Sequence, residues 1–502
     1  MHLVEKLFSW ISGAKEGERG RVFLTFIGLL CLLVSYYLIK PLRNSKFLEE
    51  FDPSKLPFVY AGVAALSFFV TKIFSTLAKR VEKYRLVVGA YTTIIIAKLL
   101  LGNWLRFGGG KIAVVCFYFF ASVYFLLAVA TLWACINDMF TVEQGERLFG
   151  FVALGSTIGS IAGSKISGII ANSEYREHTL YFSIIFLAAA LFFVLLAARG
   201  SSGQSSRRPK KKEPEIERGD FWSELRALAV RPYIRSIALS VCLLAVATTA
   251  IEFVSQGVID RELAREQYNI HFAQLQGADY ETLYKLKTKS ESQQTDYLAD
   301  LAGQNGRSVQ ELQSLYETYR KDLEAQTRSF FSKTYEWQGW AGVLSLLVVA
   351  RFLFPRVGMR YCFSILPVLS IVAFCLFGVT VDLFIIQVVI VIVGSLNYAL
   401  NNAAKEILYT ATDEETLFRF KPMIEGPCMR GGDVISSILK LSVQFIAVTL
   451  ALSAGAELNL FLAITISVLL VWLRFTWLAG KEYDRQRKEA LALDIYGDDD
   501  DD

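Results

Sequence analysis

The sequence has few of the residues that build metal centres and disulfide frameworks. Its three histidines, His2, His178 and His271, are scattered over unrelated regions. The seven cysteines include no CxxC pair and lie mostly in apolar stretches, where cysteine behaves as a small buried apolar residue. We therefore expect no metal site, no cofactor and no disulfide framework.

A nucleotide-hydrolysing loop is also missing. The stretch 150–157 spaces two glycines before Ser156 and Thr157 like a phosphate-binding loop, but it has no lysine and lies in an apolar run. In such loops the lysine reaches the phosphates. We expect a protein that is not an enzyme and does not hydrolyse ATP, and we expect no nucleic acid among its partners.

Apolar residues, by contrast, make up 53% of the chain, and the mean hydropathy is +0.39. We count twelve apolar stretches that could cross a bilayer core of roughly 30 Å, which takes about 20 residues in a helix. The stretches are continuous and do not alternate, so they predict helices and not barrel strands. The predicted fold class is an all-α, polytopic membrane protein with twelve transmembrane helices in two six-helix bundles.

Basic residues follow the second, sixth and eighth apolar stretches, within 79–85, 207–212 and 351–360. The positive-inside rule places such connections in the cytoplasm. We therefore expect a multi-pass protein surrounded by lipid bilayer, in a bacterial inner membrane, with both termini in the cytoplasm.

The spacing of the spans divides the chain into parts. The predicted boundaries are 1–21 for a cytoplasmic N-terminal segment, 22–199 for the N-terminal bundle, 200–233 for a basic linker and amphipathic helix, 234–259 and 337–480 for the C-terminal bundle, 260–336 for a polar helical insertion between spans seven and eight, and 481–502 for an acidic tail. We expect the insertion outside the cytoplasm, either as a lid or docking module without chemistry or as a surface for an extracytoplasmic partner.

A stripe of small residues, Gly155, Gly159 and Gly163, recurs every four residues in the fifth span. Glycines at this spacing allow two helix backbones to approach closely. We interpret the stripe as a packing surface, with direct contact to a solute as the alternative.

Charged residues at the end of the first span form the first candidate site. Arg43 and Lys46 lie on a connection that the positive-inside rule places outside, which indicates another role. If the helix continues past Pro41, the two residues stand three apart on one face, and two cations there suit a polyanion such as a phosphate chain. The alternative is that both extend to the interface and bind lipid headgroups.

A second charged group runs from the tenth span into the eleventh and includes Lys405, Lys421, Glu425 and Arg430. These residues can turn a charged stripe toward a cavity, since the glycine pair 431–432 permits a kink or close packing. The alternative is a solvated cytoplasmic loop.

Three patches of the chain resemble the nucleotide translocases, the ATP:ADP antiporters of plastids and obligate intracellular bacteria. The run LRNSK at 42–46 resembles their LRDTKD stretch, TVEQ at 141–144 resembles TVDEA, and KEILYT at 405–410 resembles their KEI-x-Y segment. This resemblance implies a major-facilitator-like, ATP-binding carrier that exchanges nucleotides without hydrolysing them.

The resemblance also implies roles for single residues. Lys46 matches a nucleotide-binding lysine of the family, Glu143 matches an acidic group, and Arg430 matches a lysine by position but not by type. Asn44 and Phe47 stand where the family motif has aspartates, a difference that bears on the substrate more than on the fold.

We therefore expect a transporter that exchanges nucleotides or related organic phosphates, with Arg430 across from Lys46 in the second half. One alternative is a proton-coupled carrier of another anionic metabolite with Glu252, inside the seventh span, as the ion-coupling group. Glu252 could instead be the partner of a nearby lysine. The other alternative is a transporter-like anchor that presents the 260–336 insertion to a partner.

Overall fold

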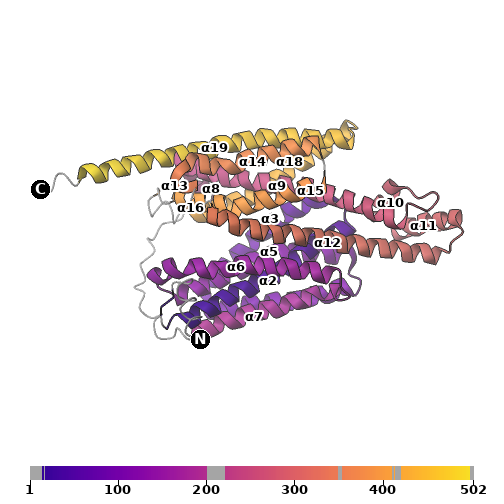
Figure 1. Ribbon diagram of the computed structural model, residues 1–502, viewed down its shortest axis with the longest axis horizontal. Helices are drawn as coiled ribbons and strands as arrows, with labels where there is room; N and C mark the ends of the chain where they lie inside the picture. The colour runs from indigo at the N-terminus through magenta and orange to yellow at the C-terminus, as the bar shows by residue number, and fades with distance from the viewer. Residues whose placement is uncertain are drawn as a thin grey trace. The chain divides into compact units, whose positions relative to one another are not determined.

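The computed structural model describes residues 14–15, 17–199, 221–348, 353–380, 382–409, 412 and 420–497, and all regular structure among them is helical (Figure 1). Eleven of the described helices are long and apolar enough to cross a membrane. The predicted all-α, polytopic class is confirmed. The predicted eighth span, 337–354, lies partly outside the described ranges. The linker 200–220 and most of segment 1–21 also lie outside them.

The chain forms two compact units. The first comprises 1–55, 65–208 and 256–339, and the second comprises 56–64, 209–255 and 340–502. Most helices of the first unit come from the N-terminal part of the chain: α2 (Arg19–Glu50), α3 (Leu56–Arg80, shared with the second unit), α4 (Lys83–Arg106), α5 (Gly110–Met139), α6 (Val142–Ala171), η2 (Arg176–His178) and α7 (Thr179–Arg199).

Helix α2 is the centre of the first unit and packs against α5, α6 and α7. The glycine stripe of α6 faces it. A Cβ placed on Gly155 would lie 2.5 Å from the carbonyl oxygen of Phe26, and one on Gly163 would lie 2.8 Å from that of Val34. These distances leave no room for a side chain, so the stripe is a packing surface that brings the two backbones together.

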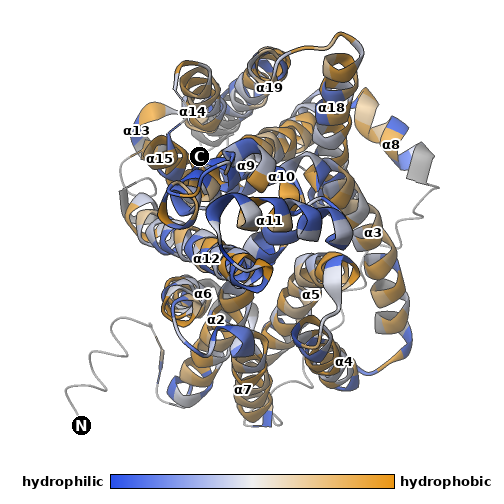
Figure 2. Ribbon diagram, turned by 90° about the vertical axis from the view of Figure 1, so that its right-hand side faces the viewer, coloured by the Kyte–Doolittle hydropathy of each residue, from blue (hydrophilic) through white to orange (hydrophobic). Residues whose placement is uncertain are grey.

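The polar insertion belongs to the first unit by its contacts. It consists of the end of α9 (Pro232–His271), α10 (Tyr280–Leu286), α11 (Glu291–Asn305) and the start of α12 (Val309–Val348). Figure 2 shows α11 as largely hydrophilic and α3 as largely hydrophobic. In agreement, α3 exposes large apolar side chains such as Phe68, Phe69 and Ile73, which suits a surface in contact with lipid.

A buried ion pair fastens the insertion to the end of α2. The Nζ atom of Lys287 lies 2.7 Å from a carboxylate oxygen of Asp260 and donates to the carbonyl oxygen of Leu48 at 2.8 Å. Because the last carbonyls of a helix have no partner within it, this ammonium caps α2. The insertion is therefore built into the first unit.

The second unit contains the early part of α9 and a set of further helices. They are α8 (Phe221–Val230), α13 (Phe354–Val357), α14 (Met359–Val379), α15 (Leu383–Leu396), η5 (Asn397–Asn401), α16 (Asn402–Tyr409), η6 (Ile424–Cys428), α18 (Met429–Thr449) and α19 (Ala454–Gly497). η5 and η6 are π-helical turns, a feature often found at functional sites. α19 extends as helix into the predicted acidic tail.

Candidate functional site

A cavity of about 160 Å³ lies within the first unit, at the end of its helices where α2 and α4 finish and α7 begins. Its lining residues are Leu42, Lys46 and Glu49 from α2, Gly102, Leu105 and Arg106 from α4, Arg176 and Glu177 from η2, Leu180 from α7, and Lys321, Glu324 and Arg328 from α12. Basic side chains outnumber acidic ones in this set, so the cavity is electropositive.

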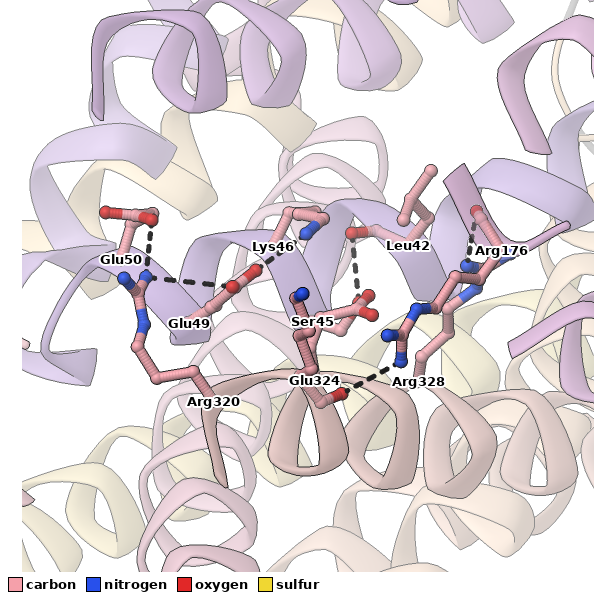
Figure 3. Close-up of polar contacts among 10 residues, drawn as sticks. Leu42, Ser45, Lys46, Glu49, Glu50, Arg176, Arg320, Glu324 and Arg328 are labelled. Atoms are coloured by element: carbon pink, nitrogen blue, oxygen red, sulfur yellow. Dashed lines mark hydrogen bonds and ion pairs between the residues drawn. The ribbon is translucent and has the colours of Figure 1, made fainter. Parts of the chain in front are cut away.

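Lys46 reaches the cavity because α2 continues through Pro41 to Glu50. Its ammonium is held by Glu49, 2.7 Å away and one turn further along the helix. Glu49 also lies 3.6 Å from Arg320, whose guanidinium is 2.6 Å from Glu50 (Figure 3). Burial alone would lower the pKa of Arg320, but the carboxylates of Glu49 and Glu50 raise it above its ordinary value.

Arg328 is the most deeply placed cation of the cavity, with no exposed surface. Its guanidinium donates to the carbonyl oxygen of Arg176 at 3.2 Å and to the hydroxyl of Thr179. The Nε atom is buried and has no hydrogen-bond partner. Burial lowers the pKa of Arg328, because the charged form loses water, and the nearby carboxylate of Glu324 offsets only part of this effect. An anion in the cavity would offset this cost.

Apart from Lys46, the other cations of the cavity resemble Arg328 in one respect. Among the residues that the structure describes, no carboxylate lies within ion-pair distance of Arg106, Arg176, Lys321 or Arg328. Arg106 and Lys321 are exposed, which places them at the mouth, whereas Arg328 lies inside. The buried carboxylate of Glu324 accepts a hydrogen bond from Ser45 at 2.7 Å and gives the cavity one acidic wall.

Arg43 does not line the cavity, although Lys46 does. Its guanidinium donates to Asn44 at 2.8 Å and to Ser122 at 3.1 Å, and it stacks over the ring of Tyr118 at 4.5 Å. The helix continues past Pro41 as the sequence suggests, but the two cations turn to different neighbours. Glu143 lies in the first turn of α6, and its side chain is outside the described part.

The second charged group lies in the second unit, and each of its cations has a carboxylate partner. The predicted residues Lys405 and Glu425 bind each other at 2.9 Å. Lys421 binds Glu406 at 2.7 Å. Glu425 lies in the π-helical turn η6, and Lys405 lies on α16, which follows the π-helical turn η5. Both members of the Lys405–Glu425 pair are therefore in or next to irregular helical backbone.

Arg430 also has a partner in the second unit. Its guanidinium lies 3.0 Å from Asp433, one turn along α18, and Asp433 accepts a hydrogen bond from Thr249 on α9 at 2.8 Å. Glu252 follows Thr249 by three residues on α9, so the two share a helix face. The expectation that Arg430 lies across from Lys46 stays a prediction.

Sequence reasoning missed most of the cavity's cations. Arg106 is the last residue of one predicted span and Arg176 precedes another. Arg328 lies in the insertion, which was expected to carry no chemistry. A signal was present for the first two, since both are basic residues on connections that the positive-inside rule places outside. Nothing in the local sequence distinguishes Arg328 from the other charges of an amphipathic helix.

No protein-family model matches the sequence, and no curated relative matches it. Solved structures with the same fold do match. A bacterial homologue of the human lysosomal transporter Spinster has a TM-score of 0.57 at 11% identity, over 94% of this chain and 99% of its own. The nucleoside transporter NupG has a TM-score of 0.52 at 13% identity, over 92% and 99%.

A POT family transporter in complex with 5-aminolevulinic acid has a TM-score of 0.55 at 12% identity, over 91% of this chain and 96% of its own. All three of these proteins are membrane transporters, and they share the major-facilitator-like architecture. At such identities the likeness establishes the fold alone: this chain has the major-facilitator-like fold.

Proposed function

We propose that this protein is a membrane transporter that exchanges phosphorylated organic anions, including nucleotides of the ATP and ADP type, by alternating access and without hydrolysis. The fold supports transport, since its structural neighbours are transporters. The charge of the cavity supports an anionic solute. The resemblance of 42–46 and 405–410 to the nucleotide translocases supports exchange.

The observation that carries this proposal is the state of Arg328. Arg328 has a buried guanidinium with an unpaired Nε atom, in a cavity that it shares with Lys46 and Arg176. This is a costly arrangement unless an anion binds there. Arginine offers phosphate a planar set of donors, and lysine adds a point charge. The cavity therefore has the chemistry of a phosphate site.

The size of the cavity limits which part of the solute can bind there. A volume of about 160 Å³ is below the roughly 300 Å³ at which pockets for drug-sized ligands begin. It holds a phosphate group but not a whole nucleotide, so the phosphoryl end is the part that we place among these cations.

Exchange can be tested with purified protein in vesicles loaded with ADP, inorganic phosphate or no solute. We expect uptake of labelled ATP into ADP-loaded vesicles and much slower uptake into empty ones, since an exchanger needs a solute on both sides. Equal uptake into all three would exclude exchange. If instead only a sugar phosphate or inorganic phosphate exchanges, the class of substrate is narrowed to that anion.

A second candidate function is a proton-coupled carrier, and one observation favours it. Asp433 and Glu252 are carboxylates of the second unit, on helices joined by the Thr249–Asp433 hydrogen bond. Carboxylates inside a membrane protein can take up and release protons. Uptake driven by a pH gradient without internal solute, and lost in Glu252→Gln, would favour this candidate over exchange.

A further inference from the structure

A lysine lies buried in a membrane-spanning helix of the first unit. Lys98 belongs to the candidate span Tyr84–Arg106, and its side chain has no exposed surface. Ionisable side chains inside a membrane are rare, costly and usually functional. Lys98 does not line the cavity, and the proposed exchange does not involve it.

Three neighbours from three helices surround the nitrogen of Lys98. The Nζ atom donates to the hydroxyl of Ser35 on α2 at 2.9 Å and to that of Ser183 on α7 at 2.6 Å. It also lies 4.3 Å from the centre of the Tyr124 ring on α5. An ammonium has three N–H groups, and this site offers two hydroxyl oxygens and one aromatic face to receive them.

The two serines are arranged as acceptors. The hydroxyl of Ser35 can donate to the carbonyl oxygen of Ser183 at 2.7 Å, and that of Ser183 can donate to the carbonyl oxygen of Ser35 at 2.8 Å. With their hydrogens used in this way, both oxygens present lone pairs to Lys98. The site is therefore built for a donor such as the ammonium.

No carboxylate neutralises this ammonium among the described residues, where the contacts of Lys98 are the two serines and the tyrosine ring. Lys440 in the second unit is a useful contrast, because its ammonium lies 2.8 Å from Glu457. A buried charge with a counter-ion is nearly neutral to its surroundings. A protonated Lys98 has no such partner, so the field of its ammonium extends through the low-dielectric interior.

Lys98 and its partner Ser35 lie on helices whose later residues line the cavity. Gly102 and Arg106 follow Lys98 by four and eight residues on α4, and both line the cavity. They therefore share its helix face, about 6 Å and about 12 Å further along the axis. On α2, Ser35 precedes the cavity residue Leu42 by two turns, so α2 and α4 both lead from Lys98 to the cavity.

We propose that Lys98 is an electrostatic determinant of anion affinity, a buried positive charge that strengthens anion binding in the cavity without touching the anion. This inference rests on the proposed function, since it assumes that the cavity binds phosphate. The effect of this charge on anion binding would explain why a lysine occupies a buried position where an apolar residue would be less costly to fold stability.

The test compares Lys98→Met, Lys98→Gln and the control Lys440→Met with the unmodified protein. Binding of inorganic phosphate and of pyrophosphate to purified protein is measured by calorimetry, together with the midpoint of thermal unfolding. Methionine keeps the unbranched shape and most of the length of the lysine side chain and removes its charge. Glutamine also removes the charge but keeps donors for the two serines.

We expect Lys98→Met and Lys98→Gln to weaken phosphate binding about 3- to 10-fold and pyrophosphate binding more, because the loss of a distant charge scales with the charge of the ligand. The unfolding midpoint should stay the same or rise in Lys98→Met, since an unpaired buried charge is removed. Lys440→Met should lower the midpoint, because Glu457 loses its partner, and leave phosphate binding unchanged.

The following results would overturn the proposed role of Lys98. Unchanged phosphate binding in a folded Lys98 variant overturns it, and so does an equal loss for both ligands, which a change of shape would produce. If neither variant folds, Lys98 is structural and the inference is overturned as well. If the unmodified protein binds neither phosphate nor pyrophosphate, the proposed function itself fails, which is a different outcome.

Discussion

The cavity of the first unit and the charged group of the second unit are built from the same residue types but are in different electrostatic states. In the second unit Lys405, Lys421 and Arg430 each lie within 3.0 Å of a carboxylate. In the cavity only Lys46 has such a partner, and the fully buried Arg328 retains an unpaired donor.

This difference teaches that the number of charges in a membrane protein says less than their pairing. Paired charges are already neutralised, so they suit positions that hold helices together or that exchange partners during a conformational change. Unpaired buried cations are costly and become favourable when an anion binds. The cavity is thus the region from which we expect anion affinity, and the second group is the region from which we expect conformational control.

The largest effect should come from the paired group. Arg430→Ala leaves the mostly buried Asp433 without its cation, and we expect it to abolish exchange while the protein remains folded. Arg430→Lys keeps a charge beside Asp433 but loses the planar guanidinium, so exchange should be weakened and not lost. The measurement is ATP uptake into ADP-loaded vesicles.

The double variant Arg430→Ala/Asp433→Asn sharpens this result, because it removes both members of the pair. Recovery of exchange would assign the pair a structural role. Continued loss of exchange in a folded protein would assign Arg430 to the solute, in line with the prediction that it lies across from Lys46.

The next effect concerns the unpaired cation. Arg328→Gln should weaken phosphate binding about 10- to 100-fold, because a charge-assisted contact contributes roughly 1.5–3 kcal/mol. Arg307→Gln changes an exposed arginine of the same insertion and serves as the matched control. Calorimetry with inorganic phosphate measures both, and equal affinities would remove Arg328 from the site.

A smaller effect is expected for the paired cation of the cavity. Lys46→Ala should weaken phosphate binding about 10-fold, less than Arg328→Gln, because Glu49 already satisfies part of the ammonium. Lys111→Ala, at an exposed position in the first turn of α5 that does not line the cavity, should bind as the unmodified protein does. A larger loss for Lys46 than for Arg328 would contradict the distinction between paired and unpaired cations.

The smallest effect should come from the exposed pair Lys421–Glu406. Glu406→Gln removes one charge of a pair whose side chains are 30% and 55% exposed, and such pairs contribute about 0–1 kcal/mol. We expect a change of that size or less in the free energy of unfolding and no change in phosphate affinity. A loss of exchange in this variant would show that the pair takes part in the transport cycle.

The sequence predicted the helical class correctly, and Lys46, which it proposed for solute binding, lines the cavity. Continuous apolar stretches identify membrane helices without knowledge of their neighbours. Lys46 was found because it lies on a connection where the positive-inside rule expects few cations. Arg43 was paired with it on spacing alone, and the structure directs that side chain to Ser122 and Tyr118 instead, since helix spacing does not say which neighbour a long side chain meets.

By itself the sequence determined that this chain is a bundle of membrane-spanning helices, because lipid offers backbone groups no hydrogen-bond partner and only local composition is needed to satisfy them. The tertiary structure alone decided which charges are paired, which are buried and which meet in a cavity. Lys98 is one lysine in an apolar run until α2, α5 and α7 surround it, and Arg328 is one charge of an amphipathic helix until α12 packs beside η2 and α7. Pairing and burial depend on residues far apart in the chain, and no local pattern records their approach.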